Sequence, residues 1–109
     1  MSETIKILVA DDHPIVRDGL IAVLETQDDF EIMGEASNGN EVLKILSKSQ
    51  ADILFIDLAM PEMDGVETIR ALQKLNSKTK IIVFTVFDTD ERIISAIKSG
   101  AKGYLLKGA

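Results

Sequence analysis

Short apolar runs alternate along this chain with segments that repeat hydrophobic residues at helical spacing. Three runs are β-branched or aromatic and apolar on both faces: Ile5–Ala10, Ile53–Asp57 and Lys80–Thr85. Such runs are typical of central strands in a parallel sheet that is covered on both sides. The more polar Phe30–Ala36 predicts an edge strand, and Gly103–Leu106 predicts a short fifth strand.

Helical periodicity fills each interval between these runs. The first helix is predicted to start at Pro14, the second after Asn38 with Glu41 as a capping partner, the third after Asp64-Gly65 and the fourth after Asp90. Strands and helices therefore alternate from end to end, which predicts an α/β fold. We expect a flavodoxin-like, doubly wound, five-stranded parallel sheet with the common strand order 2-1-3-4-5.

Length and composition narrow the class of protein. The 109 residues suffice for one domain, spanning 1–109, and 46% of them are hydrophobic, as in ordinary globular proteins. A net charge of -6 argues against non-specific binding of nucleic acid or membranes by this domain. The chain has no cysteine and a single histidine, which excludes disulfides and a zinc site built on these ligands. With no signal peptide and no membrane-length apolar run, the expected location is the cytoplasm.

Polar residues stand where the predicted strands end. The first strand is followed by Asp11-Asp12, the third ends in Asp57, the fourth in Thr85, and Lys107 follows the fifth. Ligands of open α/β sheets bind outside the carboxyl ends of the strands. In the order 2-1-3-4-5 the first and third strands are neighbours, so the three carboxylates are predicted to share one crevice.

Three oxygen ligands without cysteine favour a hard cation, and Mg²⁺ fits best because it shares carboxylates with phosphate oxygens. A carboxylate can act as a nucleophile and form an aspartyl-phosphate. Lys107 would then neutralise phosphoryl oxygens and Thr85 would donate a hydrogen bond to one of them. Asp57 is therefore predicted to be phosphorylated.

Each of these residues also has a plainer interpretation. The pair Asp11-Asp12 suits capping of the first helix about as well as metal binding. The remaining residues have ordinary structural roles open to them: Thr85 as a β-former, Lys107 as a solvated residue, His13 as a helix-entry residue, Tyr104 as core, and Asp64-Gly65 as a turn. The convergence of five polar groups at one end of a sheet favours a functional site.

The acidic pair, the stretch IDLAMPEMDG around Asp57, Thr85, and GAKGYLLK leading into Lys107 resemble the receiver domain of two-component response regulators. The resemblance covers the whole chain up to the fifth strand. It implies that Asp57 accepts the phosphoryl group from a histidine kinase. It also implies that Asp12 and Asp57 bind Mg²⁺ directly with the Ala59 carbonyl, and Asp11 through water.

The same resemblance implies that Thr85 and Tyr104 form a switch pair, with the hydroxyl moving toward the phosphoryl group and the ring turning inward. DDHPIVRDGL and GYLLK look most like NarL/LuxR-type receivers, which usually carry a C-terminal helix-turn-helix for DNA. Two positions depart from many receivers. Gly108 replaces a proline and should leave its loop freer, and Val86 is bulkier than usual and should slow small phosphoryl donors.

Particular residues argue against two of three rival functions. A haloacid-dehalogenase-type phosphatase needs a second aspartate two residues after the nucleophile, where this chain has Ala59. The expected chemistry is therefore only self-phosphorylation and slow dephosphorylation, not turnover of a substrate. A flavodoxin-like electron carrier needs a phosphate-binding loop where Asp11-Asp12 would repel an anion. The second-ranked alternative is a receiver-like interaction module that works without phosphorylation.

One face of the predicted sheet carries only the first helix. Right-handed crossovers place the other three helices on the opposite face, so apolar side chains of strands one, three and four are expected to be exposed. We expect the native polypeptide to continue with a fifth helix, a linker and a DNA-binding domain. The 109-residue chain alone is expected to form a homodimer through this face or to be less stable than an extended form.

Overall fold

Five parallel strands form one sheet in the order β2-β1-β3-β4-β5, as predicted. The computed structural model describes residues 4–75, 77–85 and 90–106. The strand bounds are β1 (Ile5–Ala10), β2 (Phe30–Ala36), β3 (Ile53–Ile56), β4 (Lys80–Thr85) and β5 (Gly103–Leu106). The predicted bounds are confirmed for every strand except β3, which ends one residue early. Its pairing with β1 stops at Ile56, opposite Ala10, and Asp57 is the first residue beyond it.

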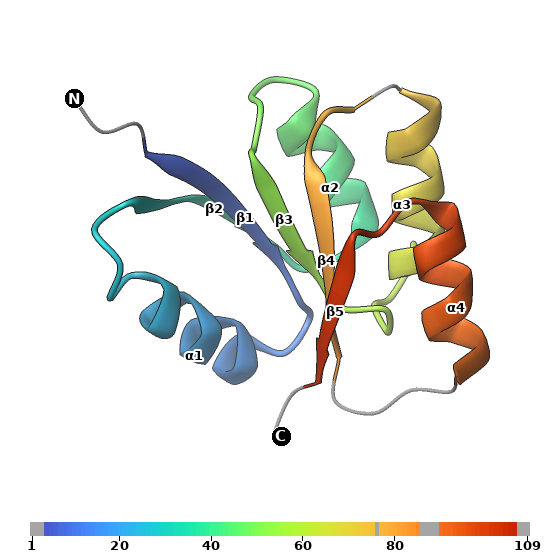
Figure 1. Ribbon diagram of the computed structural model, residues 1–109, viewed down its shortest axis with the longest axis horizontal. Helices are drawn as coiled ribbons and strands as arrows, with labels where there is room; N and C mark the ends of the chain where they lie inside the picture. The colour runs from blue at the N-terminus through green and yellow to red at the C-terminus, as the bar shows by residue number, and fades with distance from the viewer. Residues whose placement is uncertain (1–3, 76, 86–89, 107–109) are drawn as a thin grey trace.

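The helices lie in two layers (Figure 1). Three of them, α2 (Gly39–Leu46), α3 (Gly65–Lys74) and α4 (Asp90–Ser99), lie side by side on one face of the sheet, and α1 (Pro14–Leu24) lies on the other. This arrangement is the one predicted from right-handed crossovers. In the described ranges no helix combines the length and the apolar character that crossing a membrane requires.

Successive residues of the strands point to opposite faces of the sheet and pack in two separate hydrophobic cores. Leu8, Leu54, Ile56, Ile81 and Val83 face α2, α3 and α4 and are at most 1% exposed. Their chain neighbours Ile7, Val9 and Phe55 point the other way and pack with residues of α1. Because both faces of the central strands are buried, their sequences are unbroken apolar runs.

The prediction that strands one, three and four are left exposed on the α1 face is wrong for strand one and for Phe55 of strand three, and Ile82 and Phe84 of strand four are half-buried there. Ile7, Val9 and Phe55 are at most 7% exposed there, because Leu24 packs in the same cluster and Leu20 and Ile21 pack against it. The exposed apolar surface lies farther along the sheet. A shallow hollow of about 330 Å³ runs over β3, β4 and β5, lined mainly by apolar groups, and Leu105 is 49% exposed in it.

The edge strand β2 contains an irregularity. Ile7 pairs with Ile32, but the next residue, Leu8, pairs with Gly34, so Met33 is an extra residue in β2. Extra residues of this kind bend an edge strand and increase its twist. The prediction that Phe30–Ala36 is an edge strand is confirmed by the strand order.

Side-chain caps fix where α2 and α3 begin. Asn38 accepts a hydrogen bond from the Glu41 backbone N–H, as predicted, but the Glu41 carboxylate bonds to the Ser37 N–H rather than completing a capping box. Asp64, interpreted from the sequence as part of a turn, is the N-cap of α3 and forms a complete capping box with Glu67. A capping residue is worth about 1 kcal/mol, and it sets the start of the helix that follows the Asp57 loop.

Candidate functional site

Carboxylates from two neighbouring strands meet at the carboxyl edge of the sheet. Asp11 and Asp12 follow β1, and Asp57 follows β3. Backbone bonds hold both turns in place: the Asp57 N–H donates to the Ala10 carbonyl and the Asp11 N–H to the Ala36 carbonyl, each at 3.0 Å. One ligand atom from each of Asp11, Asp12, His13 and Asp57 lies within 4.8 Å of the others. The predicted shared crevice is therefore present.

Two of these carboxylates are buried. Asp11 is 1% exposed and Asp57 3% exposed. Asp11 Oδ1 accepts a hydrogen bond from the His13 backbone N–H at 2.8 Å, and Asp57 Oδ1 accepts one from the Ala59 N–H at 3.3 Å. Buried like charges this close repel each other, so the site gains stability from any cation it takes up.

The Oδ1 atom of Asp12 is the feature of this site that best fits a metal ion. Within the described part of the chain, its Oδ1 atom is buried and accepts no hydrogen bond. His13 Nδ1 lies 3.1 Å from this oxygen, although not in hydrogen-bond geometry. A buried carboxylate oxygen without a donor is costly unless a cation satisfies it. Carboxylate oxygens are also the ligands that Mg²⁺ prefers.

Neither acidic residue caps α1. The N-cap is His13, whose side chain makes no capping bond, and Pro14 stands at the start of the helix. The capping interpretation of Asp11-Asp12 is therefore wrong, and the prediction that His13 is a helix-entry residue is confirmed. Its ring is nevertheless closer to the site than expected, because Nδ1 lies 3.1 Å from Asp11 Oδ1 as well.

Arg17 was not predicted to belong to this edge. Its Nη1 donates to the Asp11 carbonyl at 2.7 Å and its Nε to Glu35 Oε1 at 2.9 Å. The guanidinium therefore ties α1 to the turn after β1 and to β2. No local pattern in the sequence indicates this role, because Glu35 lies 18 residues away.

The loop from Asp57 to α3 is held at several points. The Gly65 N–H donates to the Leu58 carbonyl at 3.0 Å, and the Gly39 N–H at the start of α2 donates to the Met63 carbonyl at 3.1 Å. Within this loop Glu62 has a φ of 67°. The residues on either side of Glu62 are hydrogen-bonded to each other, because the Met63 N–H donates to the Pro61 carbonyl. This is a γ-turn of the strained kind. The loop that carries Ala59 is thus fixed by contacts on both sides.

The predicted switch residues lie on one face of the sheet. Thr85 ends β4 and is 3% exposed. Tyr104 pairs with Val83, two residues before Thr85, so both belong to the face that carries α2, α3 and α4. Tyr104 is 50% exposed, so the interpretation of it as core is wrong. Lys107, Val86 and Gly108 lie outside the described residues.

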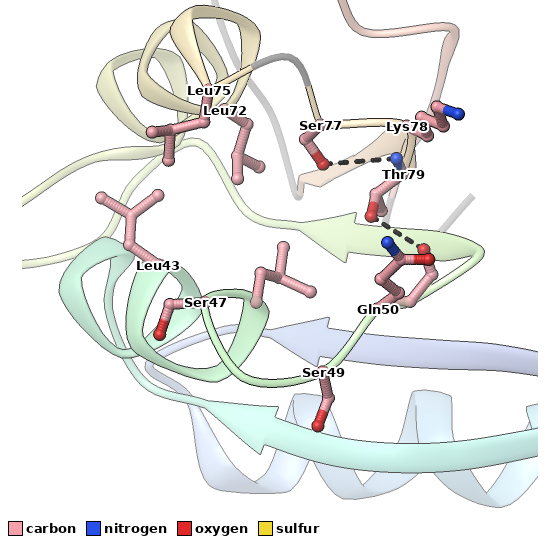
Figure 2. A pocket seen from close by; sticks show the side chains of 11 residues that line it. Leu43, Ser47, Ser49, Gln50, Leu72, Leu75, Ser77, Lys78 and Thr79 are labelled. Carbon is pink, nitrogen blue, oxygen red and sulfur yellow. Dashed lines mark hydrogen bonds between the residues drawn. The ribbon is translucent and has the colours of Figure 1, made fainter.

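A separate cavity of about 240 Å³ lies at the other end of the sheet, where α2 and α3 end and β4 begins. Figure 2 shows Leu43, Leu72 and Leu75 beside it, with Thr79 bonded to Ser77 and to the Ala51 carbonyl. Among the described residues that line it, the polar side chains are hydroxyls, an amide and Lys78, with no carboxylate. The cavity therefore lies apart from the acidic site.

Comparisons with known proteins agree with this geometry. The model of the family "response regulator receiver domain" matches residues 7–109. A curated relative, the uncharacterized transcriptional regulatory protein YhcZ of Bacillus subtilis (strain 168), is 44% identical over 102 residues, covering 94% of this chain and 48% of the relative. The nitrate/nitrite response regulator protein NarL of Escherichia coli (strain K12) is 38% identical over 105 residues, covering 96% of this chain and 49% of the relative.

A solved structure is also similar. RcsB from Salmonella enterica serovar Typhimurium, bound to promoter rprA in the presence of the phosphomimetic BeF₃⁻, matches with a TM-score of 0.89 at 27% identity. The match covers 98% of this chain and 62% of that one. The chain spans about half the length of the curated relatives it matches.

Proposed function

This chain belongs to the family of response regulator receiver domains, of the NarL/LuxR type, and from that premise we propose that Asp57 accepts a phosphoryl group from a histidine kinase. The observation that carries the proposal is the meeting of Asp11, Asp12 and Asp57 at one edge of the sheet. In the transfer, a carboxylate oxygen of Asp57 attacks phosphorus as the bond from phosphorus to the donor imidazole breaks. The imidazole leaves with the electron pair of that bond.

Mg²⁺ is the proposed cofactor. Asp12, Asp57 and the Ala59 carbonyl would bind it directly, and Asp11 through water. The buried, unsatisfied Oδ1 atom of Asp12 supports this ligand set. When bound, the ion supplies positive charge against the phosphoryl oxygens. Thr85 at the end of β4 would donate a hydrogen bond to one of those oxygens, and Lys107, outside the described residues, would add a second positive charge.

Receiver domains are generally not classical enzymes, and the proposed chemistry here is limited to phosphoryl transfer and slow hydrolysis at Asp57. Ala59 occupies the position where a related phosphatase would carry a general acid. With no positioned base two residues after the nucleophile, attack by water should be slow and the phosphorylated state should persist. Persistence is the property that a signalling switch requires.

The proposed output is control of transcription. YhcZ is described as a transcriptional regulatory protein and NarL as a response regulator, and each is about twice as long as the matched region. We propose that DNA is contacted by a helix-turn-helix domain C-terminal to residues 1–109. The net charge of -6 supports assigning DNA binding to another domain.

Incubation with acetyl phosphate and Mg²⁺ tests the proposal directly. Intact mass spectrometry should show the addition of one phosphoryl group, and chelation of the metal should reduce the addition to background. A chain that stays folded but gains no mass under these conditions would instead be the interaction module that works without phosphorylation.

Asp12→Ala should separate metal binding from stability. Removing this carboxylate removes a proposed ligand, so Mg²⁺ affinity measured by calorimetry should fall at least about tenfold. The fold should be equally or more stable in metal-free buffer, because one of the clustered charges and an unsatisfied buried oxygen are removed.

The matched control is Asp18→Ala, on the exposed part of α1. It removes the same charge and should leave Mg²⁺ affinity unchanged. A clear loss of thermal stability for Asp12→Ala in metal-free buffer would contradict the proposed role of Asp12.

Thr85→Ala should uncouple Tyr104 from phosphorylation. A hydrogen bond made only in the phosphorylated state biases the switch by about 1–3 kcal/mol. The variant should still gain a phosphoryl group, while the ring signals of the single tyrosine respond much less in NMR spectra. Thr85→Ser keeps the hydroxyl and should restore the response. Equal changes of the Tyr104 signals in wild type and Thr85→Ala would disprove the coupling.

A further inference from the structure

Arg92 connects α4 to the loop that follows Asp57. Its Nη2 donates a hydrogen bond of 3.0 Å to the carbonyl of Leu58, 34 residues away in the sequence. Arg92 is half-buried and is the third residue of α4, whose first turns lie at the same edge of the sheet as this loop (Figure 1). The contact therefore brings a guanidinium to the residue next to Asp57.

The Leu58 carbonyl receives two donors. The Gly65 N–H also donates to it at 3.0 Å, so the carbonyl is held by α3 and by α4 together. On the other side of the same peptide unit, the Ala59 N–H donates to Asp57 Oδ1 at 3.3 Å. The carbonyl and the N–H of a trans peptide point in opposite directions. Anchoring the Leu58 oxygen therefore aims the Ala59 N–H at the Asp57 carboxylate.

Helix formation does not account for an arginine at this position. The first turn of a helix carries positive partial charge, so a cation there is disfavoured. The planar guanidinium instead offers several donors in a fixed fork, and a charge-assisted bond is stronger than a neutral one. The local cost of the position is offset by the contact with the Leu58 carbonyl.

We propose that Arg92 is a positioning residue for phosphoryl transfer to Asp57. It fixes the Leu58–Ala59 peptide, so that the bond from the Ala59 N–H to Asp57 Oδ1 holds the carboxylate in one orientation for attack on phosphorus. It also polarises that peptide, because a cation at the carbonyl strengthens the N–H as a donor. This role rests on the proposed function of Asp57, whereas the clamping of the peptide does not.

The first test needs no phosphorylation. NMR spectra of the metal-free protein report the hydrogen bonding of the Leu58 carbonyl carbon and of the Ala59 amide. Both signals should shift in Arg92→Ala and shift less in Arg92→Lys, which keeps the charge but loses the fork. The matched control is Arg70→Ala, since the Arg70 guanidinium also bonds to another element, joining α3 to the Ser95 and Ser99 hydroxyls of α4, but does not contact the Asp57 loop in the described structure. Unchanged Leu58 and Ala59 signals in Arg92→Ala would overturn the clamp.

The second test measures the rate of phosphorylation by acetyl phosphate in Mg²⁺. Arg92→Ala should slow it about tenfold, the scale of one charge-assisted hydrogen bond. Arg92→Lys should recover part of the rate and Arg70→Ala should match wild type. If circular dichroism shows that Arg92→Ala is unfolded, the role of Arg92 in transfer is tested with Arg92→Lys alone. The phosphorylation rate of Arg92→Lys must then be lower than that of wild type for the proposal to stand.

Different results would exclude the clamp and the role of Arg92 in transfer. A wild-type rate in a folded Arg92 variant whose Leu58 and Ala59 signals have shifted would overturn the role in transfer while leaving the clamp intact. A wild-type protein that gains no phosphoryl group would overturn the proposed function and this role with it. In that case the carbonyl and amide signals still decide whether Arg92 holds the peptide.

Discussion

Asp57→Asn is expected to reduce Mg²⁺-dependent phosphoryl incorporation to background. Asparagine keeps the shape of the side chain and an oxygen that can accept the Ala59 N–H bond, but it lacks the anionic nucleophile. Because one of the clustered negative charges is removed, the variant should be at least as stable as wild type. Loss of incorporation with an undiminished melting temperature is the combined result expected from intact mass spectrometry and a thermal melt.

The chain offers a matched control at the opposite end of the same strand. Asp52 immediately precedes β3, as Asp57 immediately follows it, and its Oδ2 accepts the Lys6 backbone N–H at 2.8 Å. Asp52→Asn should keep full incorporation. Phosphoryl gain by Asp57→Asn at the rate of the Asp52 variant would show that another residue is the acceptor.

Gly65→Ala is expected to destabilise the fold by about 3 kcal/mol. A Cβ at this position would lie 2.6 Å from the Asp57 carbonyl oxygen and 2.7 Å from Leu58 Cα. Both atoms are backbone atoms of the fixed loop, so neither can move aside as a flexible side chain would. For a domain of this size the melting temperature should fall by about 10–20 °C.

Gly19→Ala is the contrasting change. Gly19 lies inside α1, and a Cβ there would meet no atom of the described residues within 4 Å. Alanine is the better helix former, so this variant should gain about 0.5–1 kcal/mol in urea unfolding. If Gly65→Ala and Gly19→Ala had the same melting temperature, the close approach of α3 to the Asp57 loop would have to be rejected.

The elements and the acidic edge were predictable because local patterns determine them. Buried parallel strands must be apolar on both faces, and helix starts are marked by residues such as Asn38 and Pro14. Once the strand order is fixed, Asp11, Asp12 and Asp57 must come together at one edge. The structure brings them together, while their roles remain predictions.

The contacts that hold this edge could not be predicted in the same way. Arg17 reaches Glu35, and Arg92 reaches Leu58, through long side chains whose partners are 18 and 34 residues away. Periodicity carries no information about such partners. The coverage of Ile7 and Phe55 by α1 was also mispredicted, because a count of helices per face ignores the reach of their side chains.

The extra residue Met33 has a consequence for how this protein behaves at high concentration. An edge strand presents unpaired N–H and C=O groups that can template the addition of a strand from another molecule, which leads to aggregation. In β2 the irregularity divides this edge into Phe30–Ile32 and Gly34–Ala36, and the exposed Glu31 adds a negative charge to the first part. A straight incoming strand could therefore align with only one part at a time. At this edge, irregular geometry and charge act together to keep the sheet from growing beyond its own chain.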